Sequence, residues 1–232
     1  MPFDLHLQMQ ERYAGDTGQC EAQIGTFRAD VLRDGVIYEI QTRNLRSIRG
    51  KICGLLDDWP VVIVFPVAIS TTFVYCDGDP LEEVRRRTSP KRGTPLDAFE
   101  EMVSLASVLA HCNLSVEIPL VTVEEMRRRR TEQEIARMRK RRKRRRNSVP
   151  EWETVNRRIT SFADVLRLDI PSDGLRFIPE ELPERFTSKM LGEAIGLVAW
   201  KARRITYTLR HLGTIVRHER TKDGYWYTRA DA

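Results

Sequence analysis

Residues 27–41, FRADVLRDGVIYEIQ, predict a β-hairpin around which the rest of the chain is organised. Asp34 and Gly35 are expected to form the two-residue loop, because both residue types tolerate a positive φ angle. A loop at this position pairs Arg33 with Val36, and the register then follows outward along both strands. In that register Asp30 faces Glu39.

Residues directly opposite each other share one face of a hairpin, so the register predicts a core face and a polar face. The core face comprises Phe27, Ala29, Val31, Tyr38 and Ile40, and the polar face comprises Arg28, Asp30, Glu39 and Gln41. Opposed carboxylates repel, and a divalent cation between them would remove this cost, since hard cations take oxygen ligands at about 2.0–2.6 Å. The alternative is that Asp30 and Glu39 are two solvated side chains on the open face.

Asp30 followed by Glu39-Ile40-Gln41 resembles the metal-binding signature of the PD-(D/E)XK nuclease superfamily. In that superfamily, an Asp on one strand and Glu-x-Lys on the next hold Mg²⁺. Gln41 stands where Lys is usual, so the pattern is most similar to the Glu-x-Gln branch of competence-associated and uncharacterised bacterial nucleases. The resemblance covers about the first half of the chain and implies a restriction-endonuclease-like mixed sheet.

The resemblance also implies roles for individual residues. Asp30, Glu39 and the carbonyl of Ile40 would bind Mg²⁺ or Mn²⁺, and Gln41 would position the attacking water. Arg28, opposite Gln41, would partly replace the missing positive charge.

A helix before the hairpin is expected to supply one more acidic residue, as the resemblance implies. Residues 5–13 predict that helix, and Glu11 is the candidate on it. Glu21, on a strand predicted over 19–33, is the alternative, and either residue can instead be a solvated surface glutamate.

Apolar patterns along residues 1–125 predict a mixed α/β domain. A helix over 44–56 carries Lys51, which can contact phosphates or belong to a solvated face. The other predicted elements are a buried strand over 61–67, a strand over 71–76, a basic loop over 85–93, a helix over 95–110 and an edge strand over 114–123.

The net charge of +6 hides one intensely basic segment. Residues 127–146 hold thirteen Lys and Arg against two Glu, a local charge of +11 that leaves −5 for the rest. A linker or charged helix is therefore predicted over 126–149. Its cations Arg142, Lys143 and Arg144 are expected to neutralise nucleic-acid phosphates, which releases counterions. A solvated tether between domains is the alternative.

Residues 150–232 are predicted to form a separate module. The expected elements are helices over 151–166, 186–195 and 199–212, a C-cap at Gly213 and two strands over 214–220 and 225–229. Helix, turn, basic helix and hairpin resemble the winged helix-turn-helix fold over about 45 residues. In that family the second helix enters the major groove, which implies that Lys201, Arg204 and Thr208 face DNA. Such modules also serve as protein-docking units.

These resemblances imply a metal-dependent endonuclease that acts on duplex DNA, as a homodimer or within a larger nucleoprotein complex. The alternative is a catalytically inactive DNA-binding regulator, or a subunit of a DNA defence or repair complex, built on a degenerate nuclease fold. Gln41 favours this alternative. No apolar run of about 18 residues predicts a membrane span, and the first residues lack a signal-peptide pattern. Four dispersed cysteines without a Cys-x-x-Cys pair argue against zinc and favour a cytoplasmic protein.

Overall fold

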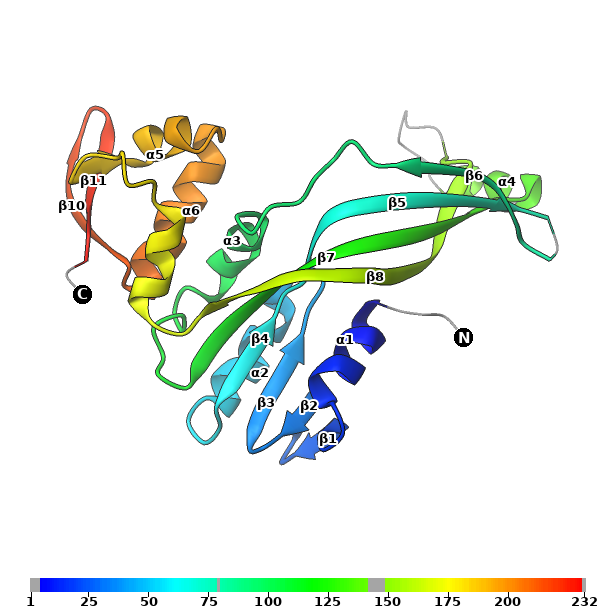
Figure 1. Ribbon diagram of the computed structural model, residues 1–232, viewed down its shortest axis with the longest axis horizontal. Helices are drawn as coiled ribbons and strands as arrows, with labels where there is room; N and C mark the ends of the chain where they lie inside the picture. Colours follow the sequence, from blue (N-terminus) through cyan, green and yellow to red (C-terminus); the bar gives the residue numbers. More distant parts are fainter. Residues whose placement is uncertain (1–4, 79, 142–148, 231–232) are drawn as a thin grey trace.

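A computed structural model describes residues 5–78, 80–141 and 149–230. The described chain is a mixed α/β structure with one eight-stranded sheet and one three-stranded sheet (Figure 1). In the large sheet the order is β1-β2-β3-β4-β7-β5-β6, and β8 pairs with β7. The expected fold class is confirmed.

The hairpin formed by β2 (Phe27–Arg33) and β3 (Val36–Ile40) has the predicted loop and register. Val31 pairs with Tyr38 and Arg33 with Val36. Asp34 and Gly35 adopt positive φ angles of 52° and 75°. A two-residue loop therefore sets the register here, as expected.

The strand predicted over 19–33 is instead two strands, because Gly25 adopts a φ of 55° and turns the chain. β1 (Gln19–Ile24) pairs with β2, with Cys20 opposite Val31 and Ala22 opposite Ala29. Glu21, between these pairs, also has a positive φ of 55°. Residues with such φ values are uncommon outside glycine and mark a local irregularity of the strand.

The hairpin residues do not all cover the side of the sheet that the register predicts. Val31, Tyr38 and Ile40 pack in the apolar cluster under α1, whereas Ala29 and Phe27 pack in the cluster under α2. The predicted single core face is thus wrong at its outer end. The change of side occurs at Asp30.

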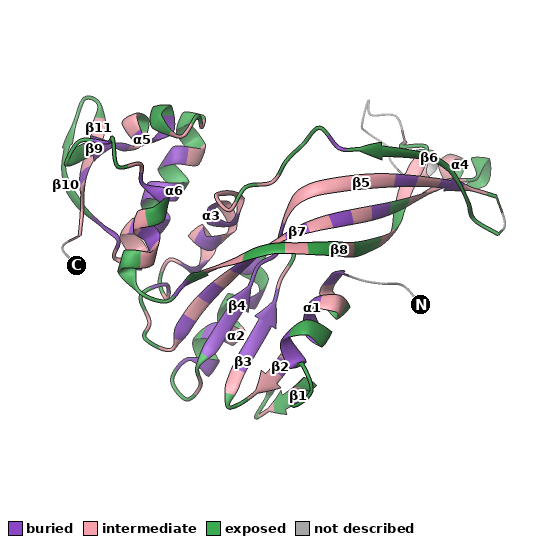
Figure 2. Cartoon of the chain, viewed as in Figure 1, coloured by how far each residue is buried: buried purple, intermediate pink, exposed green. Residues whose placement is uncertain are grey.

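Two helices cover opposite faces of the strands around the hairpin. α1 (Leu5–Ala14) packs on one face, and η1 (Leu45–Ile48) with α2 (Arg49–Leu55) packs on the other. β4 (Val61–Val64) then pairs parallel to β3. The predicted helix over 44–56 is present as these two consecutive helical segments, and Figure 2 shows that β3 and β4 are buried between the helices.

Four long strands extend from this body as an arm (Figure 1). They are β5 (Val67–Asp77), β6 (Glu82–Thr88), β7 (Leu114–Arg129) and β8 (Trp152–Leu168). β6, which was predicted as a basic loop, and β8 form the two edges of the arm. α4 (Glu132–Arg141) follows β7, so within the linker or charged helix predicted over 126–149 the helix begins at Glu132.

β7 is a central strand, so the edge position predicted for residues 114–123 is wrong. The amide of Phe65 donates to the carbonyl of Glu117 at 2.8 Å, and backbone groups two residues apart in a strand point to the same edge. Pro119 has no N–H. The position that an N–H would take faces the gap between the end of β4 pairing at Glu117 and the start of β5 pairing at Leu120. No ladder hydrogen bond is lost there.

The predicted helix over 151–166 is wrong, because these residues form β8 and pair with β7 along nearly its whole length. Three register shifts insert extra residues into β8. The less exposed positions consequently recur every third residue, at Asn156, Ile159, Phe162 and Val165. This spacing imitates the apolar stripe of a helix. Residues 152–168 thus belong to the large sheet and not to the C-terminal module.

The C-terminal module follows the end of β8. Its elements are η3 (Pro171–Phe177), β9 (Arg185–Thr187), α5 (Ser188–Ala194), α6 (Ala199–Leu212), β10 (Ile215–Thr221) and β11 (Gly224–Arg229). Thr187 caps α5 by accepting from the Met190 amide at 3.3 Å, and Gly213 ends α6 with a φ of 88°. Helix, helix and hairpin occur in the order expected for a winged helix.

The module packs against α3 (Asp97–Met102), which continues as η2 (Val103–Leu105) and is shorter than the helix predicted over 95–110. The rings of Phe99 and Phe177 stack edge to face at 4.8 Å. The described residues form one continuous apolar cluster across this junction.

The two glycines of α2 give a direct test of how the hairpin packs on that helix. A Cβ at Gly54 would lie 2.8 Å from Phe27 Cζ, whereas a Cβ at Gly50 has nothing within 4 Å. We expect Gly54→Ala to destabilise the fold by about 1–3 kcal/mol through overpacking. The matched control Gly50→Ala should stabilise it by about 0.5–1 kcal/mol through helix propensity. Urea unfolding measures both, and equal effects would contradict this packing.

Candidate functional site

Asp30 and Glu39 meet where the two strands of the central hairpin separate. Backbone pairing between β2 and β3 ends at Val31 and Tyr38. Beyond that pair, Asp30 Oδ2 accepts from the Ile40 amide at 2.7 Å, and Glu39 Oε1 accepts from the Asp30 amide at 3.4 Å. Two carboxylates therefore replace backbone carbonyls as the link between the strands, and they lie together as the register predicted.

Glu39 is almost completely buried and is paired with a lysine of α2. Its side chain is 1% exposed, and Lys51 Nζ lies 2.6 Å from the carboxylate. Burial raises the pKa of Glu39 to about 7, the hydrogen bond from Lys51 opposes this rise, and the negative charge of Asp30 adds to it. Lys51 also donates to the carbonyl of Arg28. Its ammonium is thus directed into the site rather than to solvent.

α1 contributes His6 and Gln10 to the other side of the site. His6 Nε2 lies 3.3 Å from Asp30 Oδ2, and Gln10 Nε2 donates to the Asp30 carbonyl at 3.2 Å and to Glu21 Oε1 at 2.7 Å. Glu21 stands opposite Asp30 in the neighbouring strand. His6 and Gln10 are not among the site residues predicted from the sequence, although their i, i+4 spacing puts them on one helix face.

Glu11 and Arg28 do not take the positions expected for them. Glu11 is exposed on α1, one residue beyond the buried Gln10. Glu21, the alternative to Glu11, shares the donor Gln10 with Asp30. Arg28 Nε pairs with Glu21 Oε2 at 2.6 Å, so its guanidinium does not compensate for Gln41. Gln41 follows β3 directly, and its amide donates to the Val64 carbonyl at 2.9 Å.

The oxygen atoms at this position could provide some of the ligands of a small hard cation. Asp30, Glu39 and the Ile40 carbonyl offer oxygen ligands, and Mg²⁺ typically binds one or two carboxylates and fills its other positions with water or phosphate oxygens. Among the described residues, however, no three His, Cys, Asp or Glu side chains are grouped to hold a metal ion. The ammonium of Lys51 supplies the positive charge beside Glu39 that a metal ion would otherwise supply.

A basic groove lies between α6 and the hairpin formed by β10 and β11. Its volume is about 510 Å³. Six cations line it, against the single carboxylate of Asp223: Lys189, Arg203, Arg210, Arg217, Arg220 and Lys222. Tyr207 and Tyr225 also line the groove.

The α6 residues that were expected to face DNA lie on the side of the helix that packs on α3. Lys201 Nζ is 2.5 Å from Glu100 Oε1, and Arg204 Nη1 is 3.6 Å from Glu100 Oε2. Thr208 is fully buried and donates to the Phe99 carbonyl at 3.4 Å. Burial excludes Thr208 from contact with DNA, and Lys201 and Arg204 are directed to Glu100 because the packing of α6 turns the opposite side of the helix toward the groove. Arg142, Lys143 and Arg144 lie outside the described residues.

The hydrogen bond from Lys51 should lower the pKa of Glu39, whatever the function of the site. We expect Lys51→Met to raise the pKa of Glu39 above its value of about 7, because the hydrogen bond that lowers this pKa is lost. Carboxyl ¹³C NMR titration of the metal-free protein measures this. Arg49→Met, an exposed change on the same helix, is the control and should leave the titration unchanged. An unaltered or lower Glu39 pKa in Lys51→Met would contradict the pairing.

Comparisons with known proteins give a family but no activity. An uncharacterized protein of Treponema pallidum (strain Nichols) is 27% identical over 121 residues, which are 52% of this chain and 48% of that protein. The chain therefore spans about half the length of this relative. No solved structure matches, and in the described ranges no helix is long and apolar enough to cross a membrane. A family model matches residues 3–169, up to the end of β8. The chain belongs to the family described as Domain of unknown function (DUF8091).

Proposed function

We propose that the protein is a metal-dependent endonuclease that hydrolyses phosphodiester bonds in DNA. The observation that carries this proposal is the meeting of Asp30 and Glu39 at the point where β2 and β3 separate, with Lys51 Nζ 2.6 Å from Glu39. The order α1-β1-β2-β3-α2-β4 supports it, because the resemblance to PD-(D/E)XK nucleases calls for a helix before the acidic strands and another directly after them.

In this proposal Asp30, Glu39 and the carbonyl of Ile40 hold Mg²⁺ or Mn²⁺. Such an ion lowers the pKa of a bound water and neutralises charge on a phosphate. Lys51 carries the positive charge that the Glu-x-Gln pattern lacks, and in the absence of metal Glu39 and the Arg28 carbonyl orient its ammonium. Gln41, just beyond β3, orients water through its side-chain amide.

Duplex DNA is the proposed partner, and the groove between α6 and the β10–β11 hairpin is its proposed binding surface. Six cations and one carboxylate line this groove, and each phosphate that a Lys or Arg neutralises releases counterions. A cytoplasmic location is supported by the four free cysteines, since thiols persist in a reducing compartment.

A second candidate is a DNA-binding regulator, or a subunit of a DNA defence or repair complex, that does not cleave. The ion pair of Glu39 with Lys51 favours it. Lys51 satisfies the carboxylate without a metal, and the described residues contain no cluster of three metal-ligating side chains.

Cleavage of plasmid DNA distinguishes the two candidates. We expect the wild type to nick supercoiled plasmid in Mg²⁺ or Mn²⁺, and Asp30→Asn to be slower by at least about a hundredfold, as for other groups that stabilise developing charge. Asparagine retains an oxygen that can accept from the Ile40 amide, so the fold should be preserved. Equal nicking by both proteins would indicate a contaminant. DNA binding without nicking in either ion would favour the regulator.

Two neighbouring arginines of α6 test the orientation of the winged-helix module. Arg203 lines the groove, whereas Arg204 is directed to Glu100 on α3. We expect Arg203→Gln to weaken binding to any duplex and to reduce the slope of log K against log salt by about 1. Arg204→Gln removes the same charge and should leave the slope unchanged. Fluorescence anisotropy across a salt series measures both, and a reversed order would place DNA on the other side of α6.

A further inference from the structure

The arm carries three aromatic rings on one face of its sheet. Phe73 lies opposite Arg87, and Tyr75 lies opposite Arg85. Residues directly opposite share a face, so both rings and both guanidinium groups are on the same side. Trp152 joins them, because its ring lies 4.9 Å from that of Tyr75 in an edge-to-face contact.

These rings are half-buried and lie among arginines. Arg127 stacks 3.6 Å from the centre of the Phe73 ring, and Arg85 lies 5.6 Å from the centre of the Tyr75 ring. None of the three rings is fully buried. Aromatic rings alternating with cations on an accessible sheet face can stack bases and neutralise phosphates of a single strand.

The arginines of β6 differ in how they are neutralised on the two faces of the arm. On the opposite face Arg86 and Arg158 both pair with Glu124. On the aromatic face, and within the described chain, Arg85 and Arg87 make no ion pair with a carboxylate. The uncompensated positive charge of β6 is therefore on the same side as the rings.

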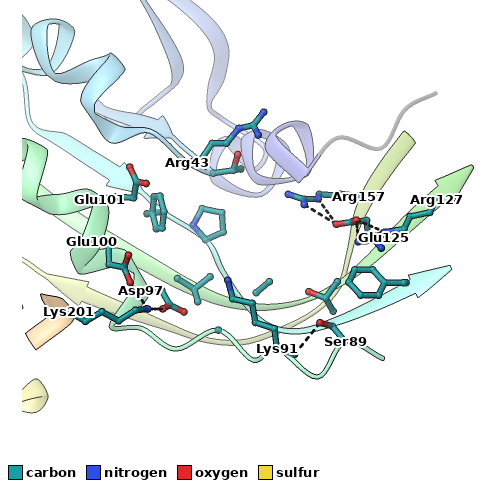
Figure 3. A pocket seen from close by; sticks show the side chains of 18 residues that line it. Arg43, Ser89, Lys91, Asp97, Glu100, Glu101, Glu125, Arg127, Arg157 and Lys201 are labelled. Carbon is teal, nitrogen blue, oxygen red and sulfur yellow. Dashed lines mark hydrogen bonds and ion pairs between the residues drawn. The ribbon is translucent and has the colours of Figure 1, made fainter. Parts of the chain in front are cut away.

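The aromatic face continues into a cleft of about 530 Å³ (Figure 3). Phe73 and Arg127 line both the arm face and this cleft. Figure 3 shows Lys91 pointing into the cleft from one wall, with Arg43 across from it. Arg157 also lies across from Lys91 and is paired with Glu125. Asp97, Glu100 and Glu101 of α3 line the cleft as well. Arg43 comes two residues after Gln41, so the cleft opens where β3 ends, beside the hairpin that carries Asp30 and Glu39.

We propose that the aromatic face of the arm and this cleft bind a single-stranded segment of nucleic acid. Bases stack on Tyr75 and Trp152, and Arg85, Arg87 and Lys91 neutralise the phosphates. An unpaired strand fits this surface because its bases expose the ring faces that a duplex stacks internally. With a duplex in the winged-helix groove, the preferred substrate is a junction between double-stranded and single-stranded DNA. This last step rests on the proposed function.

Binding to a labelled oligothymidylate of 20 nucleotides tests the proposal in EDTA, where cleavage plays no part. We expect the double variant Arg85→Gln/Arg87→Gln to bind about tenfold more weakly than wild type, since it loses two phosphate contacts. The matched control Arg86→Gln/Arg158→Gln removes the same charge from the other face of the arm and should bind within about twofold of wild type. Equal weakening by both double variants would overturn the proposal, because bulk charge would then explain binding.

A second pair of variants tests stacking separately from charge. Trp152→Ala should weaken binding to the oligothymidylate by about tenfold, which corresponds to about 1.4 kcal/mol and is within the range measured for one stacked base. Trp200→Ala changes an exposed tryptophan of α6 and should have no effect. Unchanged binding by Trp152→Ala, with circular dichroism matching the wild type, would overturn the proposal. If the wild-type protein binds the oligothymidylate but does not nick plasmid DNA, only the proposed endonuclease activity is refuted.

Discussion

The arrangement of the site depends on side-chain carboxylates that accept hydrogen bonds in place of backbone carbonyls. At the end of the central hairpin, the carboxylate of Asp30 takes the hydrogen bond from the Ile40 amide that the opposite strand would otherwise accept. Glu39 does the same for the Asp30 amide at a longer distance. The strands can therefore separate without leaving these amides unpaired, which would be costly in a buried region. Two carboxylates are held together as a consequence, and their mutual repulsion must be offset by a nearby positive charge.

The surrounding elements supply that charge and fix the position of both carboxylates. Lys51 of α2 pairs with Glu39, and His6 of α1 contacts Asp30, so helices on opposite faces of the sheet meet at this point. Burial still dominates the electrostatics, because the pKa of Glu39 is raised to about 7 in spite of Lys51. A carboxylate whose pKa is shifted by burial and by specific charged partners marks a candidate functional position.

Local rules sufficed for the hairpin and failed wherever long-range pairing decides the structure. The Asp34-Gly35 loop predicted the register and the neighbouring carboxylates, because a two-residue turn determines both. β8 could not be recognised, because three bulges give it a period of three that depends on its partner β7. The contact of Lys51 with Glu39 could not be predicted either, since it depends on how α2 packs on the sheet. For the same reason the sequence does not predict that Lys201 and Arg204 pair with Glu100 of α3.

Binding of a metal ion between Asp30 and Glu39 can be measured directly. A crystal of the protein soaked in Mn²⁺ and measured at a wavelength with strong manganese anomalous scattering reports the ion independently of any activity. We expect one anomalous peak within about 2.0–2.6 Å of an oxygen of each carboxylate, with the Lys51 ammonium displaced from Glu39. Absence of a peak there, with Lys51 still paired to Glu39 at saturating Mn²⁺, would contradict it.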